Sequence, residues 1–108
     1  MSISLPKPIA RYFAADKAGD ADALASCFTG DGVVRDEGGT FKGGPAIKRW
    51  NEEAGAKYHY TVEPLSATEQ DGRIVVVGKV AGDFPNSPIN LEHIFRVAGD
   101  KIVSLEIR

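Results

Sequence analysis

Cysteine and histidine are scarce in this chain. Cys27 is the single cysteine among the 108 residues, so no intramolecular disulfide can form. The two histidines, His59 and His93, lie far apart and give no spacing suited to a metal ion. No run approaches the roughly 20 apolar residues that a membrane-spanning helix needs. These absences exclude a disulfide-stapled domain and a spanning helix, and they predict no metal site.

An excess of one charge sign is also missing. The chain has 13 basic and 15 acidic residues, a net charge of −2, and no basic patch or tail. This balance predicts that neither nucleic acid nor a membrane is a partner. The first residues lack the charged and apolar regions of a secretory signal. We therefore expect a cytoplasmic protein.

Enough apolar residues are present for a core. Hydrophobic residues make up 43% of the chain and charged residues 26%, a balance that predicts folding rather than disorder. The length predicts a single domain over residues 1–108. A domain of this size hides only about two-thirds of its surface, so a dimer interface would help it.

The first half of the sequence has the periodicity of helices. Ser4 and Pro6 suit the start of a first helix and Gly19 suits its end. The apolar face of this helix is Leu5, Ile9, Tyr12 and Phe13. Asp20 predicts the cap of a short second helix, whose inner face would carry Leu24, Cys27 and Phe28. A third helix is expected to open at Gly43-Gly44-Pro45, with an apolar stripe of Ala46, Ile47, Trp50 and Ala54, and to end at Gly55.

Strands are expected between the second and third helices and throughout the rest of the chain. A strand at 33–36 turns at Gly38-Gly39 and returns through Phe41. The later strands are expected at 58–69, 73–84, 89–97 and 101–107. Asp71-Gly72 is a two-residue hairpin signal, and Pro64 indicates a bulge or a sheet edge. Helices followed by antiparallel strands describe an α+β fold, with Pro64, Gly78 and Gly82 expected at the bends.

Four stretches in a fixed order support one family. They are residues 11–20, residues 24–31, Val33-Val34-Arg35-Asp36 leading to Gly43-Gly44-Pro45-Ala46-Ile47, and Phe95 to Ile102. Together they resemble the nuclear transport factor 2-like superfamily, which includes ketosteroid isomerases and SnoaL-type polyketide cyclases. The resemblance implies a cone-shaped domain, a strongly curved antiparallel sheet wrapped on three N-terminal helices. It also implies a homodimer through the outer face of the sheet.

Asp36 is the first candidate catalytic residue. The resemblance implies a general base here, which removes a proton next to a carbonyl group. Such a base needs a carboxylate facing an apolar cavity, because desolvation raises its pKa. The alternative is an exposed turn residue, since Asp36-Glu37-Gly38-Gly39 also has the composition of a loop.

Tyr12 and His93 are the other two catalytic candidates. Tyr12 occupies the position of an oxyanion-stabilising tyrosine, or else it is a core tyrosine. His93 stands where the isomerases carry a protonated aspartate, and a histidine can also donate a hydrogen bond there. Strand alternation places His93 on the apolar face with Leu91 and Phe95. A one-residue bulge would place Glu92 there instead.

An aromatic and aliphatic wall would suit a flat, mostly apolar ligand. The expected wall is Phe13, Val34, Phe41, Trp50, Tyr60 and Phe95, each of which can equally be ordinary core. The Gly43-Gly44 pair lacks the features of a phosphate or dinucleotide loop, so we predict no cofactor.

Three functions remain open on the sequence alone. The first is an isomerase-like or cyclase-like enzyme acting on a small apolar carbonyl compound. The second is a binding module with the same pocket and no chemistry. The third is a structural or interaction domain whose concave face is filled by core.

Overall fold

The computed structural model describes residues 4–108, which form three helices and one six-stranded sheet. The helices are α1 (Lys7–Ala18), α2 (Ala21–Ser26) and α3 (Gly44–Tyr58). The strands are β1 (Phe28–Asp36), β2 (Gly39–Lys42), β3 (Thr61–Gln70), β4 (Arg73–Ala81), β5 (Ile89–Ala98) and β6 (Lys101–Ile107). Their order across the sheet is β2-β1-β6-β5-β4-β3. The predicted α+β class is confirmed.

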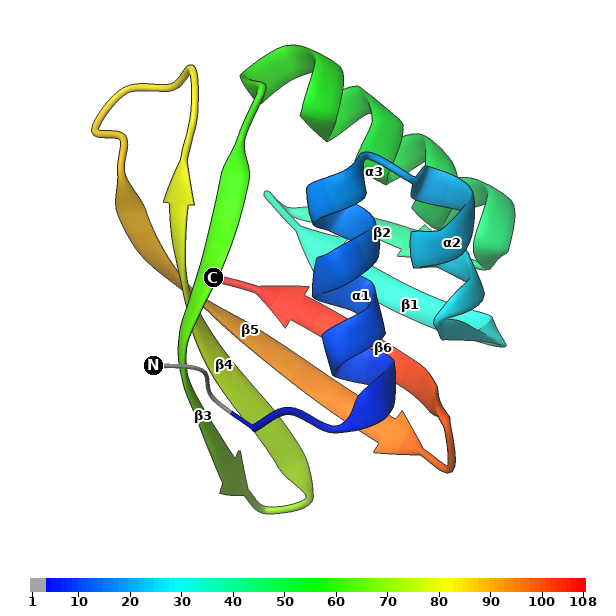
Figure 1. Ribbon diagram of the computed structural model, residues 1–108. Helices are drawn as coiled ribbons and strands as arrows, with labels where there is room; N and C mark the ends of the chain where they lie inside the picture. The colour runs from blue at the N-terminus through cyan, green and yellow to red at the C-terminus, as the bar shows by residue number, and fades with distance from the viewer. Residues whose placement is uncertain (1–3) are drawn as a thin grey trace.

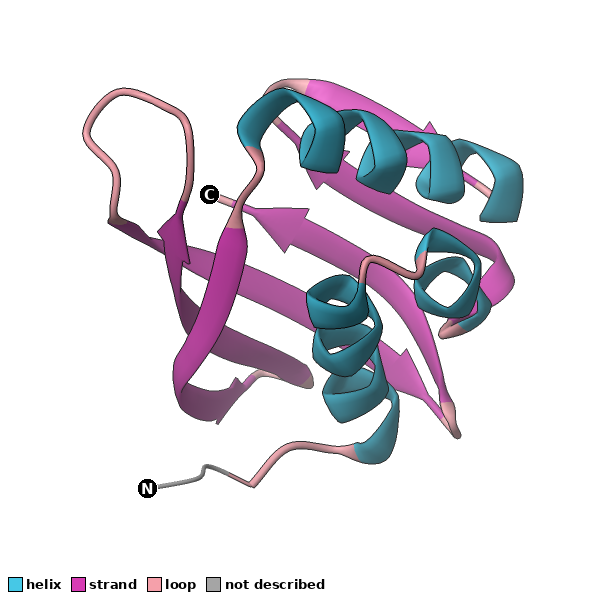
Figure 2. Ribbon diagram, turned by 45° about the horizontal axis from the view of Figure 1, so that its top comes forward, coloured by secondary structure: helices cyan, strands magenta, loops and turns pink. Residues whose placement is uncertain are grey.

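The sheet curves around the helices, and all three helices lie on its concave side (Figures 1 and 2). Neighbouring strands run antiparallel except for β1 and β6, which pair in parallel. An antiparallel sheet throughout was expected from the sequence, so this pair corrects that expectation. The parallel pair arises because β1 comes before α3 and the hairpins, and the last strand returns beside it.

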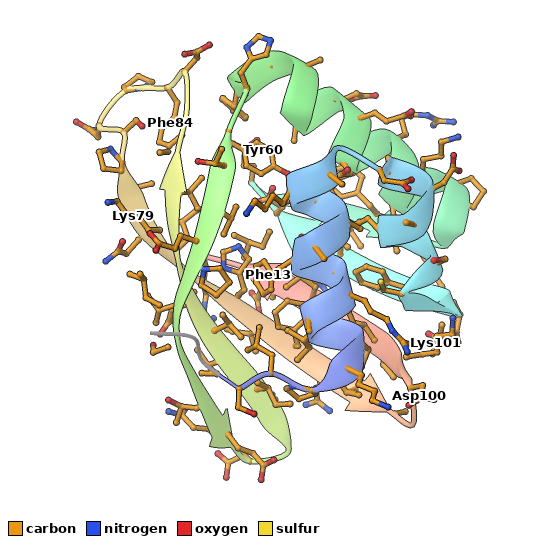
Figure 3. All side chains as sticks on the ribbon, in the orientation of Figure 1. Phe13, Tyr60, Lys79, Phe84, Asp100 and Lys101 are labelled. Atoms are coloured by element: carbon orange, nitrogen blue, oxygen red, sulfur yellow. The ribbon has the colours of Figure 1, made fainter. Side chains whose placement is uncertain are left out.

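The core lies between the helices and the concave face. Completely buried side chains come from both layers, among them Ile9 of α1, Ile47 of α3 and Phe95 of β5. Figure 3 shows Phe13 between α1 and the sheet, whereas Lys79 points away from the helices. No helix of residues 4–108 is long and apolar enough to cross a membrane.

Three expected helix boundaries were wrong. α1 begins at Lys7 rather than beside Ser4, with Pro8 in its first turn, where the missing amide hydrogen of proline costs nothing. α2 ends at Ser26, so Phe28 begins a strand instead of completing a helix face. α3 runs through Gly55 to Tyr58 and is ended by His59 in the left-handed conformation (φ 46°). An interior glycine costs a helix only about 1 kcal/mol relative to alanine.

The strand boundaries follow the expected pattern with three differences. β1 begins at Phe28, whereas the strand was expected to begin at Val33. β3 begins at Thr61 because Tyr58 belongs to α3, and β4 ends at Ala81, which leaves Phe84 in the loop 82–88. The hairpin at Asp71-Gly72 has positive φ at both residues, as a type I′ turn requires. The register shifts just after Pro64, and β3 is an edge strand. Both the expected bulge and the expected edge are therefore present.

Gly78 and Gly82 allow close approaches at the curved end of the sheet. A Cβ at Gly78 would lie 2.9 Å from Val62 Cγ1 and 3.0 Å from His93 Cε1. A Cβ at Gly82 would lie 2.7 Å from the Tyr58 carbonyl oxygen. These two glycines let β3, β5 and the end of α3 converge, and a cavity opens where they meet.

Candidate functional site

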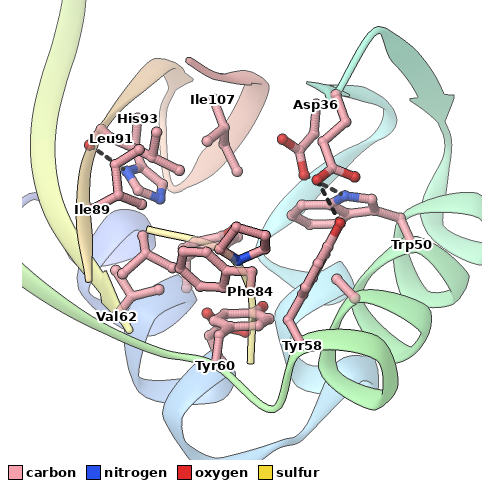
Figure 4. Close-up of a pocket in the computed structure, with 16 residues that line it drawn as sticks. Asp36, Trp50, Tyr58, Tyr60, Val62, Phe84, Ile89, Leu91, His93 and Ile107 are labelled. Carbon is pink, nitrogen blue, oxygen red and sulfur yellow. Dashed lines mark hydrogen bonds between the residues drawn. The ribbon is translucent and has the colours of Figure 1, made fainter. Parts of the chain in front are cut away.

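A cavity of about 280 Å³ opens between the helices and the curved end of the sheet (Figure 4). Its wall is largely aromatic and aliphatic, with three acidic residues and one histidine among the polar groups. The residues that line it are Tyr12, Asp16, Asp36, Glu37, Trp50, Ala54, Tyr58, Tyr60, Val62, Val80, Phe84, Pro85, Ile89, Leu91, His93 and Ile107. The volume is near the lower end of the range for small-molecule sites, about 300–1,000 Å³.

Asp36 lies at the end of β1 and faces this cavity. The turn after it has positive φ at Glu37 and Gly38, so Asp36 remains paired with Gly39 in the sheet and is not a loop residue. Its Oδ2 accepts a hydrogen bond of 3.1 Å from Trp50 Nε1. Burial raises the pKa of the Asp36 carboxyl, and the Trp50 hydrogen bond opposes that rise. The Glu37 backbone also donates to this carboxyl and acts in the same direction as Trp50, so Asp36 is a partly desolvated carboxylate held by two donors.

Tyr12 projects from α1 into the middle of the aromatic cluster. Its ring meets Phe13, Phe28 and Phe95 edge to face, at centroid distances of 5.1, 6.1 and 5.4 Å. The side chain is 2% exposed, and its hydroxyl makes no hydrogen bond to any residue between 4 and 108. Burial, reinforced by the charge of Asp16, raises the pKa of the phenol well above its ordinary value. Tyr12 therefore keeps its proton and has it free to donate.

His93 lies on β5 with its ring in the cavity wall, and Glu92 is exposed on the other face. The ring is 3% exposed, and its Nδ1 lies 3.2 Å from the Leu91 carbonyl oxygen. Burial lowers the pKa of the imidazole, so the neutral form is favoured. Its edge faces Phe13 at a centroid distance of 5.6 Å.

A hydrogen-bonded group at the α1 side of the cavity was not predicted from the sequence. Asp16 Oδ1 accepts hydrogen bonds from Tyr60 Oη at 2.7 Å and Asn51 Nδ2 at 2.9 Å. Burial and the Asp16 charge raise the pKa of Tyr60, so the phenol stays protonated. The signal was available in the sequence, because Asp16 follows Tyr12 by four residues and therefore shares its helix face.

The rim of the cavity, which we define as Tyr58, Phe84 and Pro85, joins the end of α3 to the loop 82–88. The Tyr58 and Phe84 rings meet at 5.9 Å, and the Asp83 amide donates to the Tyr58 carbonyl oxygen at 2.6 Å. Tyr58 Oη also donates to Glu37 Oε1 at 2.9 Å. The rim is thus held by contacts near the surface rather than by the core.

The structure brings five of the nine predicted site residues to this cavity. Tyr12, Asp36 and His93 line it together with Trp50 and Tyr60. The other four lie elsewhere. Phe13, Val34 and Phe95 are buried in the core, and Phe41 packs beside Trp50 at a centroid distance of 6.2 Å. The side chains of these four residues fill the layer between the helices and the sheet. The rest of the cavity wall is formed by Tyr58, Phe84 and the aliphatic residues of β3 to β6.

No group of three or more potential metal-ligating side chains comes together within residues 4–108. The polar groups of the cavity are three carboxylates that each accept a hydrogen bond from a tyrosine or a tryptophan, three phenols and one imidazole. Such a set can remove a proton, hold a developing negative charge and orient a polar ligand within an apolar wall.

The curved sheet on three helices, with a cavity at its open end, defines a domain of the nuclear transport factor 2-like class. Within that class, the model of the SnoaL-like domain matches residues 9–105. The chain belongs to this family.

Solved structures agree with this assignment. The chain is 40% identical to a candidate polyketide cyclase from Sinorhizobium meliloti, with a TM-score of 0.92 over 96% of this chain and 95% of that one. A Catenulispora acidiphila protein with a ketosteroid isomerase-like fold, solved with trimethylamine, shares 20% identity and a TM-score of 0.84 over 97% and 86% of the two chains.

SalBIII, an epoxide hydrolase/cyclase-like enzyme of pyran ring formation in salinomycin, shares 23% identity and a TM-score of 0.77 over 93% and 85% of the chains. These last two likenesses show the fold alone. Among curated proteins, none matches this chain.

Proposed function

We propose that this domain is a cofactor-free enzyme that removes a proton next to the carbonyl group of a small, flat, mostly apolar compound. Asp36 is the base, and Tyr12 donates a hydrogen bond to the oxygen that becomes negative as the enolate forms. The reaction class is that of an isomerase or a cyclase, since both proceed from such an enolate.

The position of Asp36 carries this proposal. A carboxylate removes a proton from carbon effectively only when its pKa is brought closer to the operating pH. Burial acts on Asp36 in that direction, while Trp50 fixes one carboxylate oxygen. The carboxyl group lines the cavity, where a ligand can meet it.

Tyr12 supports the same chemistry from the helix side. Its side chain lines the cavity and its phenol keeps its proton, so a ligand oxygen can accept a hydrogen bond from it. A donor already oriented in a cavity shielded from water stabilises a developing oxyanion without first having to reorganise. The likeness to a candidate polyketide cyclase supports this class of reaction.

Exchange of α-protons tests the proposal directly. A panel of small cyclic ketones is incubated with the protein in D₂O, and deuterium incorporation is followed by NMR. A positioned base contributes about 10²–10⁴ in rate, so Asp36→Asn should lose a factor of this size. Asp31→Asn, an exposed acid of the same strand, is the matched control and should exchange at the wild-type rate. Equal rates in wild type and Asp36→Asn would refute the role of Asp36.

One observation favours a second candidate, a binding module without turnover. The Trp50 hydrogen bond stabilises the Asp36 carboxylate and so opposes its basicity. A binding module predicts that ketones bind to wild type and Asp36→Asn with similar affinity, and that no exchange occurs in either. The cavity beside Asp36 supports both of these functions over a purely structural domain.

A homodimer through the outer sheet face is the partner that we propose for the chain. Val75 and Val77 of β4 lie on that face and are half-buried in the single chain, so a second copy would cover them. Light scattering after gel filtration should give twice the mass of the chain, and Val77→Glu should give the monomer. A monomeric wild type would overturn the proposal.

A further inference from the structure

The two nitrogens of the His93 ring have different surroundings. Nδ1 lies 3.2 Å from the carbonyl oxygen of Leu91. A carbonyl oxygen can only accept a hydrogen bond, so the 3.2 Å contact assigns the proton of the neutral ring to Nδ1. The backbone of Val76 is a second acceptor beside the ring. The remaining nitrogen, Nε2, then carries a lone pair and is an acceptor.

Nε2 points into the cavity and finds no donor there. Figure 4 shows the dashed bond from the ring to Leu91 and the other ring nitrogen directed toward the open space. None of the residues between 4 and 108 donates a hydrogen bond to it, and His93 is only 3% exposed. A ring nitrogen with a lone pair and no donor from the protein can accept a hydrogen bond from a ligand, and His93 lines the cavity in which a ligand would lie.

The ring cannot turn away to find another partner. Behind it, a Cβ at Gly78 would lie 3.0 Å from Cε1 and 3.3 Å from Nδ1, so the ring rests directly on the backbone of β4. Phe13 packs against its edge at a centroid distance of 5.6 Å. Leu91, Val62 and Ile107 are apolar neighbours of His93 in the cavity lining. His93 is therefore fixed with its lone pair toward the cavity.

We infer that His93 is a specificity-determining residue that accepts, through Nε2, a hydrogen bond from a hydroxyl or N–H group of the ligand. The ligand is then a flat, largely apolar molecule with a donor at the His93 side. In Figure 4, His93 and Asp36 stand on different sides of the cavity, so the reacting carbonyl lies away from that donor. The location of the carbonyl rests on the proposed function, whereas the donor does not.

This role is the reverse of the one expected from the sequence, where His93 was to donate a hydrogen bond to the enolate oxygen. The single N–H of the neutral ring already donates its hydrogen bond to the Leu91 carbonyl, so no N–H is left to donate to an enolate oxygen. Burial disfavours the doubly protonated ring that could donate from both nitrogens. Tyr12 is left as the donor to the oxyanion.

Indole and benzofuran make a matched pair of probes. They have the same flat two-ring shape, but indole carries an N–H where benzofuran carries an oxygen. One neutral hydrogen bond corresponds to about a three- to tenfold change in affinity, so calorimetry should show indole binding tighter by this factor. In ¹⁵N-labelled protein, the Nε2 resonance should be that of an unprotonated nitrogen and should shift on adding indole but not benzofuran. Equal affinities, no binding of indole, or a proton on Nε2 in the free protein would overturn the inference.

Variants assign the preference to a residue. His93→Gln can still accept a hydrogen bond and should retain the preference for indole, whereas His93→Met fills a similar volume and should lose it. If His93→Met does not fold, the nitrogen spectrum of the wild type decides. Asp36→Asn should keep the preference even where it abolishes proton exchange, which separates this inference from the proposed function. A preference that survives in His93→Met and disappears in Asp36→Asn would assign the donor to Asp36 and refute the role of His93.

Discussion

Replacing Trp50 by phenylalanine should weaken the fold in a pH-dependent way. The substitution removes the 3.1 Å hydrogen bond from Nε1 to Asp36 Oδ2 and keeps an aromatic ring beside Phe41. A hydrogen bond to a charged group contributes about 1.5–3 kcal/mol. Asp36 is only half-buried, so solvent screening reduces the expected contribution to about 1 kcal/mol. Lost ring volume adds a second cost that does not depend on pH.

The sign of the pH dependence follows from the two influences on Asp36. Burial raises its pKa above the ordinary 3.8, and the Trp50 bond lowers it, so Trp50→Phe should raise it further. The folded variant then holds its proton to higher pH than the unfolded chain does. Its stability relative to wild type should therefore fall as the pH rises from below 3.8 toward neutrality. In acid, the protonated Asp36 carboxyl still accepts a hydrogen bond from Trp50. About half of the contribution of this hydrogen bond to the free energy of unfolding therefore remains.

Urea unfolding of wild type and Trp50→Phe at pH 7 and in acid measures this difference. A carboxyl-carbon NMR titration reports the Asp36 pKa in both proteins. In an Asp36→Asn background, Trp50→Phe should cost the same at both pH values, which isolates the carboxylate as the cause. A stability difference that is independent of pH in the wild-type background, or a fall in the Asp36 pKa, would refute the reasoning.

Two further pairs of substitutions test the cavity wall. Tyr60→Phe removes a 2.7 Å bond to Asp16 and should lower the free energy of unfolding by about 1–2 kcal/mol; Tyr58→Phe, whose bond is exposed, should cost less than about 1 kcal/mol. Urea unfolding distinguishes them, and equal costs would contradict the buried network. Gly78→Ala places a methyl group 2.9 Å from a neighbouring side chain and should cost about 1–3 kcal/mol. Gly55→Ala, in open space within α3, should instead stabilise the folded protein by about 0.5–1 kcal/mol. If Gly78→Ala were as stable as wild type, the side chains around Gly78 would have to move to accommodate the methyl group, which would contradict the tight packing inferred here.

The sequence predicted the fold well because each element has local signals. Asp20 caps α2 by accepting from the Ala23 amide at 3.0 Å, and Gly19 ends α1 with φ 69°. The misplaced boundaries come from tertiary contacts that no local pattern contains. The Tyr58 ring, for example, packs against Phe84, 26 residues later in the chain, and α3 extends to hold it.

The candidate site was predictable in its chemistry but not in its geometry. Tyr12, Asp36 and His93 could be chosen by residue type and position, and all three line one cavity. The direction of the His93 proton depends on the position of the Leu91 carbonyl, which only coordinates provide. Phe13 and Phe95 were expected in the wall because aromatic residues suit both a core and a pocket, and the sequence does not distinguish the two uses.

The rim offers a route by which this scaffold can change its ligand. The floor of the cavity shares residues with the core, so substitution there threatens the whole domain. Phe84 and Pro85 belong instead to a surface loop, where insertions and exchanges are tolerated at little cost. Selection or directed evolution can therefore change the width and the polarity of the cavity entrance while Tyr12, Asp36 and His93 stay in place.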